Sequence, residues 1–373
     1  MADTQKRFYY KGSEVKRLFY NGQEISKAYY SGTITSSIGQ LYLNNWLVFN
    51  KTEENCISLH SSYPFTVATA ALAKEWDGKV QYSYDKIDWT EWNGETISVA
   101  ANTYLYMNGT GNTYLSGGYS NFSISDYASH WVISSASGNW ITISGNMELL
   151  LDYAEVAAGR HPAMAKAAFA GLFCHDKNLN GVITIPATTL TEYCYARMCA
   201  WTDIAVKTFP AKIVPSYAYY EMFRDDSSSW LVWDASVWVK TQMYATTIYS
   251  HGCERMFFDC IHMQQTPSGM SKIKSVAEDA CASMFNSCTS MTKLPELDNI
   301  DDLATECFIT MFYRCSGIHL YTEESPGYNT NYWISYNIPA GVGNPMISMF
   351  YGTTGGVTTP TNGATYYTDS IES

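Results

Sequence analysis

The eight residues CASMFNSC, at positions 281–288, are the clearest copy of a unit that recurs through the second half of the chain. The unit has a small residue, then Met-Phe, then Cys, and is followed by a turn and a short apolar segment. The position of Phe285 recurs in five other copies, at Phe173, Cys199, Phe223, Phe257 and Phe312. Self-similarity of this kind predicts an array of stacked units that share one continuous core.

Each unit is predicted to hold one short helix over the Met-Phe segment and one short strand after it. Neither element can bury its Met, Phe and Cys side chains alone, so the repeat is stable only as an array. The Ala-rich stretch 154–170, interrupted at His161-Pro162, is also predicted to be helical. The predicted strands of the array are Val182–Ile185, Ile204–Phe209, Trp230–Trp233, Met291–Leu297 and Ile318–Tyr321.

Nine of the ten cysteines lie between Cys174 and Cys315, within these units. Several form pairs seven residues apart, such as Cys253 and Cys260. On a helix that separation is about 10 Å along the axis, which is too long for a disulfide. Cysteine is small and apolar, so we expect buried free thiols in the core of the array.

The first half of the chain shows strand patterns instead. An aromatic segment followed by Lys-Gly, Asn-Gly or Ser-Gly recurs three times, in residues 8–12, 18–22 and 28–32, which predicts tight hairpins. This small sheet is either a β-meander at the edge of the next domain or a module that docks the chain in a larger assembly. Short alternating segments follow from residue 41, for example Val80–Tyr84 and Thr103–Met107, and frequent turns between them predict a β-sandwich or jelly roll.

The predicted fold class is therefore a multi-domain, β-rich chain, with a β-sandwich or jelly-roll-like domain followed by an irregular α/β leucine-rich-repeat array. The expected domains are an aromatic β-repeat docking segment at 1–40, a β-sandwich-like domain at 41–152, the array at 153–325 and a C-terminal cap at 326–373.

The repeated unit resembles the BspA-like leucine-rich repeats of bacterial surface proteins and phage proteins. Residues 281–297 (CASMFNSCTSMTKLPEL) and 185–195 carry the resemblance most closely, whereas residues 217–223 lack the cysteines and 224–252 carry an insertion. The aromatic N-terminus and residues 80–92 (VQYSYDKIDWTEW) resemble modules joined to such repeats in virion appendage proteins of phages of gut bacteria. The resemblance implies a solenoid that binds partners rather than an enzyme.

Composition narrows the possible partners. The net charge of −12 argues against nucleic acid, because phosphate binding needs clustered Lys and Arg. The first residues lack the apolar segment of a secretory signal, and no stretch is long and apolar enough for a membrane span. Together with these observations, the resemblance to virion appendage proteins implies a fibre or tail appendage of a virion, made in the host cytoplasm, that forms homo-oligomers and contacts other virion proteins and a host surface glycan or protein. The alternatives are a purely structural capsid- or tail-associated protein and a bacterial cell-surface adhesin.

Catalytic and metal motifs are not evident in the sequence. Residues 176–181 (DKNLNG) begin like a calcium loop, but position twelve is Ala187 instead of the bidentate Glu, so a turn between repeat elements is the preferred interpretation. No GxSxG, phosphate-loop or HExxH pattern occurs. We expect no enzymatic activity, no catalytic residues, no metal and no cofactor; a glycan hydrolase is the alternative.

The candidate binding residues lie in the insertion that interrupts the array. Trp230, Trp233 and Trp238 follow the acidic pair Asp225 and Asp226 there. Exposed rings flanked by hydrogen-bonding groups suit sugar stacking or protein contact, whereas buried rings would simply be core. Arrays tolerate insertions on one face, which is often the binding face. The binding hypothesis therefore rests on these five residues.

Overall fold

The computed structural model describes residues 56–120, 123, 129–136, 138–225, 241–295, 297, 300–323, 332–335, 342–369 and 371, together with four short strands near the N-terminus. These are β1 (Phe8–Tyr10), β2 (Ser13–Val15), β3 (Phe19–Tyr20) and β4 (Gln23–Glu24). β1 pairs antiparallel with β2, and β3 pairs antiparallel with β4. Two of the three predicted hairpins are thus confirmed as strand pairs, and the third, at residues 28–32, lies outside the described residues.

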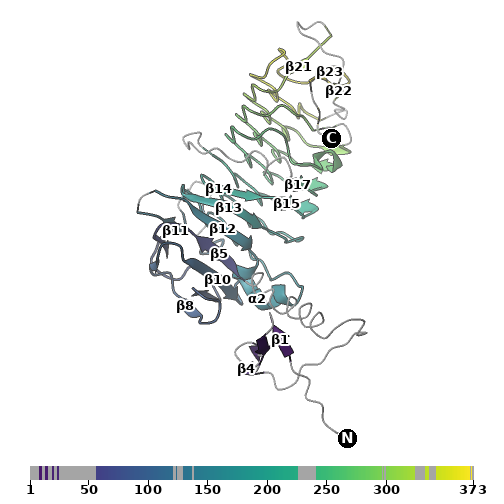
Figure 1. The fold of residues 1–373 in the computed structure, drawn as a ribbon. Coiled ribbons are helices and arrows are strands. Elements are labelled where there is room, and N and C mark those ends of the chain that lie inside the picture. Colours follow the sequence, from purple (N-terminus) through teal and green to yellow (C-terminus); the bar gives the residue numbers. More distant parts are fainter. Residues whose placement is uncertain are drawn as a thin grey trace.

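Two sheets form the next part of the chain (Figure 1). The larger has the strand order β14-β13-β12-β5-β10-β7-β8, and the smaller has the order β11-β6-β9. Their strands are β5 (Ile57–His60), β6 (Phe65–Thr69), β7 (Lys79–Ser83), β8 (Thr90–Trp92), β9 (Ile97–Val99), β10 (Tyr104–Thr110), β11 (Trp131–Ser134), β12 (Ile141–Asn146), β13 (Leu179–Thr184) and β14 (Asp203–Val206). The predicted strands of this region are therefore present.

Aromatic rings fill the core of this two-sheet unit. Trp76, Trp92 and Trp131 are buried and pack ring against ring, with Trp92 lying 5.0 Å from Trp76 and 4.9 Å from Trp131 between ring centroids. Trp140, by contrast, is exposed. The alternating burial of strands such as β11 and β12 confirms the period-two pattern of the sequence.

The second half of the chain is a stack of coils, drawn in teal to yellow in Figure 1. Seven coils are present in the described part of the chain, and each contains a run of consecutive turns. We call them coils A to G, with turn runs at residues 166–175, 192–201, 216–223, 250–259, 278–287, 305–314 and 345–352. Together these runs form one long side of the stack, which we call the ridge; in coil C it also includes the next two residues, Arg224 and Asp225.

The predicted helices of the repeat units are wrong, because the ridge is built from turns. In coil E the Ala282 N–H donates to Asp279 O within the coil, at 3.1 Å, but the Ser283 N–H donates to Ile309 O of the next coil, at 2.9 Å. Along the ridge of coils A to F, alternate N–H groups are directed to the next coil in this way. Every fourth residue, such as Ser283 and Ser287, takes a positive φ. Carbonyls offered by the adjacent coil thus replace the i−4 carbonyls of an α-helix.

One α-helix is described, α2 (Leu149–Ala157), with a non-helical residue at Asp152. It covers only the first residues of the predicted Ala-rich helix 154–170, since the chain enters the ridge of coil A at residue 166. A 3-10 helix, η2 (Met270–Lys272), lies between coils D and E.

Short parallel strands form the other sides of the stack. β15 (Thr208–Phe209) pairs with β17 (Gln242–Met243), and a second sheet has the order β16-β18-β19-β20. Its strands are β16 (Ile213–Val214), β18 (Thr247–Ile248), β19 (Ser275–Val276) and β20 (Asp302–Leu303). At the C-terminal end an antiparallel sheet has the order β21-β23-β22, from β21 (Leu320–Tyr321), β22 (Tyr332–Ser335) and β23 (Thr365–Thr368). The predicted strands 182–185, 204–209 and 318–321 have counterparts here, 291–297 forms only isolated bridges, and 230–233 lies outside the described residues.

Backbone hydrogen bonds connect the two-sheet unit directly to coil A of the stack. β12 pairs in parallel with β13 of coil A, so the larger sheet crosses the boundary predicted at residue 152. On the ridge side, the N–H groups of His130 and Trp131 donate to Gly171 O and Leu172 O of coil A. Gly181 permits the close approach of β13 to β12, because a Cβ there would lie 2.1 Å from Ile143 O. The two sheets therefore continue two sides of the first coil.

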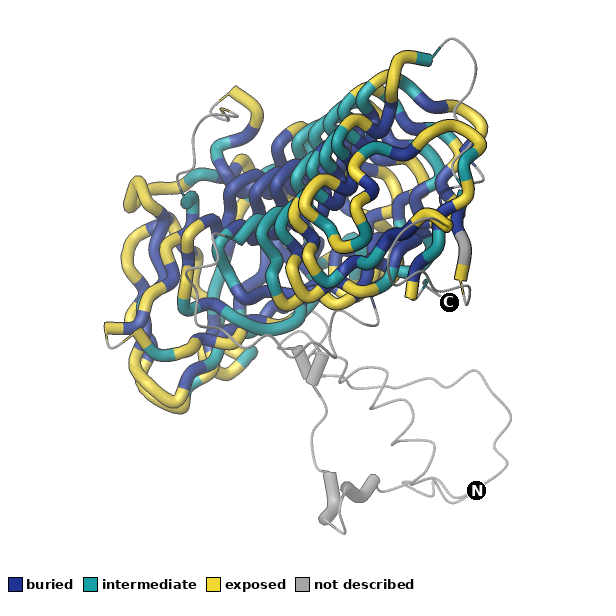
Figure 2. Tube along the Cα trace, turned by 90° about the horizontal axis from the view of Figure 1, so that it is seen from above, coloured by how far each residue is buried: buried dark blue, intermediate teal, exposed yellow. Residues whose placement is uncertain are grey.

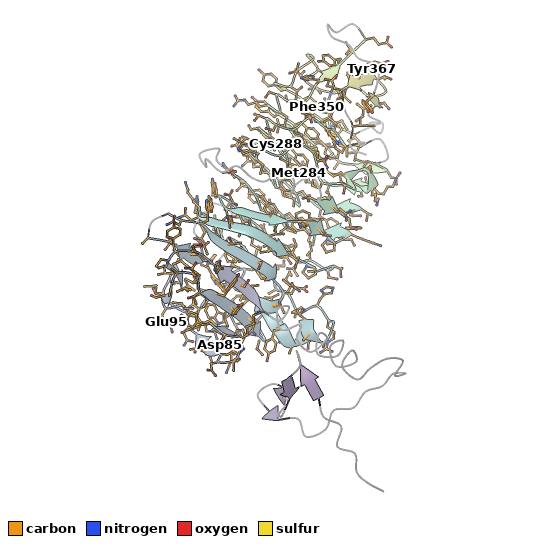
Figure 3. The ribbon with its side chains drawn as sticks, in the orientation of Figure 1. Asp85, Glu95, Met284, Cys288, Phe350 and Tyr367 are labelled. Atoms are coloured by element: carbon orange, nitrogen blue, oxygen red, sulfur yellow. The ribbon has the colours of Figure 1, made fainter. Side chains whose placement is uncertain are left out.

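The repeat register predicted from Phe285 is confirmed in the core. Phe223, Phe257, Phe285 and Phe312 stack on one another at 5.4–5.5 Å between centroids, and Phe350 of coil G continues the stack at 5.4 Å (Figure 3). Coil G lies within the predicted C-terminal cap, 326–373, so the stack of coils extends beyond residue 325.

All ten cysteines carry free thiols, and nine of them are buried. Three of the thiols donate to the carbonyl oxygen of a phenylalanine in the preceding coil. These contacts join Cys260 to Phe223, Cys288 to Phe257 and Cys315 to Phe285, at 3.1, 3.1 and 2.9 Å. The cysteine ladder therefore runs beside the phenylalanine stack, although the helix geometry used to predict it does not exist.

Candidate functional site

In the sequence, the predicted binding insertion follows the ridge residues of coil C. The described chain stops at Asp225 and resumes at Thr241, just before β17. Trp230, Trp233, Trp238 and Asp226 lie outside the described residues. Asp225 is the one predicted binding residue whose surroundings can be examined.

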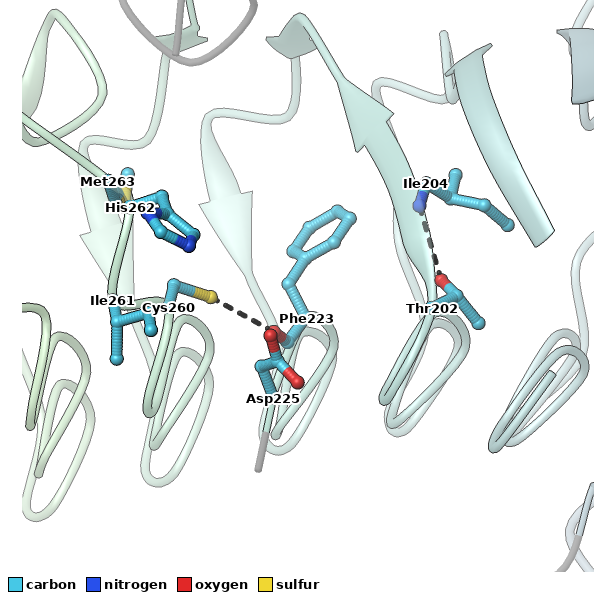
Figure 4. A pocket seen from close by; sticks show the side chains of 8 residues that line it. All are labelled: Thr202, Ile204, Phe223, Asp225, Cys260, Ile261, His262 and Met263. Carbon is cyan, nitrogen blue, oxygen red and sulfur yellow. Dashed lines mark hydrogen bonds between the residues drawn. The ribbon is translucent and has the colours of Figure 1, made fainter. Parts of the chain in front are cut away.

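Asp225 lines a small cavity between coils B and D (Figure 4). Thr202 and Ile204 line it from coil B, Phe223 from coil C, and residues 260–263 from coil D. The cavity volume of about 10 Å³ corresponds to roughly one water molecule. It is too small for a sugar ring, so any larger ligand would have to bind outside it.

Acidic groups dominate the electrostatics of this cavity. Burial and the neighbouring Asp225 carboxylate raise the pKa of Asp203 to about 7. Burial, together with the carboxylates of Asp225 and Asp259, raises the pKa of the Cys260 thiol well above its usual value. A thiol that stays protonated is a poor nucleophile, and here its Sγ–H donates to Phe223 O. We therefore expect Cys260 to remain a protonated, hydrogen-bonded thiol.

Asp203 predicts a pH dependence of stability. Its folded-state pKa lies above the unfolded value, so the native state holds a proton that the unfolded state releases between pH 4 and 7. The free energy of unfolding should therefore fall as pH rises through this window, by at most about 1.4 kcal/mol per pH unit for one proton.

Asp203→Asn should be more stable than the unsubstituted protein at pH 8, and the advantage should shrink toward pH 4. Urea unfolding at several pH values measures this, with exposed Asp88→Asn as the control. A constant difference across the range would contradict it.

The ridge of coils B to D carries a polar cluster that the sequence analysis missed. Glu221 is fully buried, and its carboxylate accepts from Arg197 Nε at 2.7 Å and from Arg224 at 2.7 Å, with Arg255 at 3.4 Å. Arg197 is 1% exposed. The Arg224 guanidinium lies over the rings of Trp201 and Phe258. Figure 2 shows the ridge as a mixture of buried and half-buried residues.

The sequence does not reveal this cluster, because its members are separated by irregular numbers of residues along the chain. Arg197, Glu221 and Arg255 meet only because they occupy the same ridge position in successive coils. The same holds for Tyr193, Tyr217 and His251, which form another such column of residues at one ridge position in successive coils. Their rings are stacked, with centroids 4.7 and 4.5 Å apart. In coils E and F the column of Glu221 holds Ser283 and Thr310, which share a 2.7 Å hydrogen bond.

The calcium-like stretch at 176–181 belongs to the junction with the two-sheet unit. The Asp176 carboxylate is buried and accepts from the Ile133 N–H at 3.1 Å, and Asn180 accepts a hydrogen bond from Thr142. Leu179–Thr184 is strand β13. These side chains thus join strands, in line with a structural interpretation of the motif. Among the described residues, no group of three or more His, Cys, Asp or Glu side chains is arranged to hold a metal ion.

None of the helices in the described residues has the length and apolar character needed to cross a membrane. Comparisons with protein-family models, curated proteins and solved structures find no match to this chain.

Proposed function

We propose that this chain is a non-enzymatic phage virion protein, a fibre or tail appendage that binds a host surface glycan or a neighbouring virion protein. In this proposal the coil stack is a BspA-like leucine-rich-repeat solenoid of unusual form, the two-sheet unit is its sandwich-like cap, and residues 1–40 dock the chain in the particle.

One observation carries the proposal. The described coils are bonded to one another along the ridge, and the repeat spacing is interrupted in the sequence between Asp225 and Thr241, a segment that carries three tryptophans. Rigid scaffolds commonly present recognition residues on such insertions. Tryptophan offers a large ring face to sugars or to a protein pocket.

Replacing Trp230 and Trp233 by Ala tests the proposal. If the two rings are hot spots, binding should weaken by about 2 kcal/mol or more, roughly 30-fold. The melting temperature should change little, because exposed rings contribute little to the core. Binding would be measured as retention of the purified protein on host cells and on immobilised surface polysaccharide, with Trp140→Ala in the two-sheet unit as the matched control for an exposed tryptophan.

Two outcomes would contradict it. Unchanged retention together with a large drop in melting temperature would make both tryptophans core residues. Failure of the unsubstituted protein to bind cells or polysaccharide, while it still joins assembled particles, would favour the purely structural alternative.

A further inference from the structure

The parallel sheet β16-β18-β19-β20 has an open edge at β16, between coils A and B. These two coils are bonded to each other along the ridge, where the Ala167 N–H donates to Glu192 O, and again through β13 and β14. On the third side of the stack, however, no backbone hydrogen bond among the described residues joins 186–190 to 210–214. Among the described residues, no ladder like those of the ridge and of β13 and β14 joins the two coils on this side.

The backbone of β16 points hydrogen-bonding groups at this gap. Lys212 O accepts from the Thr247 N–H at 3.1 Å, and Val214 O accepts from the Tyr249 N–H at 2.9 Å. Both carbonyls therefore face β18. Because successive residues of a strand direct their backbone groups to opposite sides, the N–H and C=O of Ile213 face away from β18. They form the edge that another strand could pair with.

A groove of about 320 Å³ lies along this edge. Thr188 and Leu190 line it from coil A, and Pro210, Lys212, Ile213 and Pro215 line it from coil B. Its volume is within the range of natural binding sites. The lining is mainly apolar, and Lys212 is its charged residue.

Ile213 differs in polarity from the residues at the same position in the other strands of its sheet. In the paired strands its position is occupied by Thr247, Ser275 and Asp302, all polar, as expected on an outward face. At the open edge the residue is instead isoleucine, and its side chain is 53% exposed. An apolar side chain next to an open strand edge is a binding feature or an aggregation hazard, and proteins normally protect such edges.

We propose that this groove binds an extended segment of a partner polypeptide, which adds a strand to β16. The segment would exchange backbone hydrogen bonds with Ile213, place an apolar side chain against Ile213 and Leu190, and bring a carboxylate to Lys212. Main-chain pairing supplies affinity and the groove supplies specificity, as in other cases of strand addition. This proposal does not depend on the proposed glycan binding.

A library of immobilised, acetylated and amidated random hexapeptides tests the inference with the full chain as the probe. We expect enrichment of peptides that combine a β-branched or leucine residue with Asp or Glu. Ile213→Lys should lose this enrichment, and Lys212→Gln should lose the preference for the carboxylate. Leu72→Lys, which alters an exposed leucine of the two-sheet unit, is the matched control and should bind like the unsubstituted protein.

The best hexapeptide should also be made with single N-methylated amides. Methylation of the amide that pairs with Ile213 should weaken binding about tenfold, the value of one lost hydrogen bond, while methylation of its neighbours should not. Three results would overturn the inference: no enrichment over Ile213→Lys, equal binding of all the methylated peptides, or self-association of the chain that Ile213→Lys abolishes, which would make the occupant a second copy.

Discussion

Glu221→Ala is expected to lower the free energy of unfolding by about 3–5 kcal/mol, the cost of removing one partner of a buried ion pair. The substitution would leave Arg197, which is 1% exposed, with its charge buried beside an empty site. It would also remove the carboxylate oxygen that Arg224 and Arg255 share. Urea unfolding followed by circular dichroism measures the effect.

Two further variants separate the buried pair from the surface contacts. Arg255→Ala removes a half-exposed partner, and should cost no more than about 1 kcal/mol. The double replacement Arg197→Met with Glu221→Leu removes both buried charges, so it should recover much of the stability lost in Glu221→Ala. If Glu221→Ala proves no more destabilising than Arg255→Ala, the ridge cluster contributes nothing to the stack.

Phe285→Ala is expected to be the second large effect, at about 3–5 kcal/mol. The ring of Phe285 is buried between those of Phe257 and Phe312, each with its centroid 5.5 Å away and nearly parallel. Removing it opens a cavity in the middle of the stack, and the bonded coils on both sides prevent collapse. Cys315, which donates to Phe285 O, would lose part of its packing as well.

The position along the stack supplies the controls. Phe350→Ala removes the described ring contact with Phe312, whereas Phe285→Ala removes contacts with two rings of the column, so Phe350→Ala should cost less than Phe285→Ala. Tyr351, also in coil G, is 51% exposed and stacks on Tyr313, so Tyr351→Ala should cost less than about 1 kcal/mol. Equal losses for Phe285→Ala and Tyr351→Ala in urea unfolding would show that the phenylalanine column does not hold the coils together.

The proposed binding sites differ in how far the sequence could predict them. The interruption of the repeat after Phe223 was visible directly, because the spacing between copies changes there. The groove at β16 was not visible, since Ile213 is a single apolar residue in a short strand. Only its pairing with Thr247 shows that the column is otherwise polar and that its own edge is open.

The sequence by itself determined which side chains face the core. A Phe or Met that recurs at a fixed place in each unit must meet its equivalents when units stack, so the phenylalanine column followed from spacing alone. Strands such as β7 and β10 were predictable for a similar reason, because alternation between apolar and polar residues is a local property of the chain.

Only the tertiary structure decided the backbone conformation of the ridge, the extra coil G and the junction across residue 152. A short Met-Phe segment has the apolar spacing of a helix. Its N–H groups can donate either to carbonyls of the same segment or to carbonyls of the next coil, and the sequence of one unit does not determine which acceptor they use. The Arg197–Glu221–Arg255 cluster has the same origin. Its members lie at the same position in successive coils and are therefore close in space. The number of residues between them varies with the length of each loop, so their sequence separation does not reveal the contact.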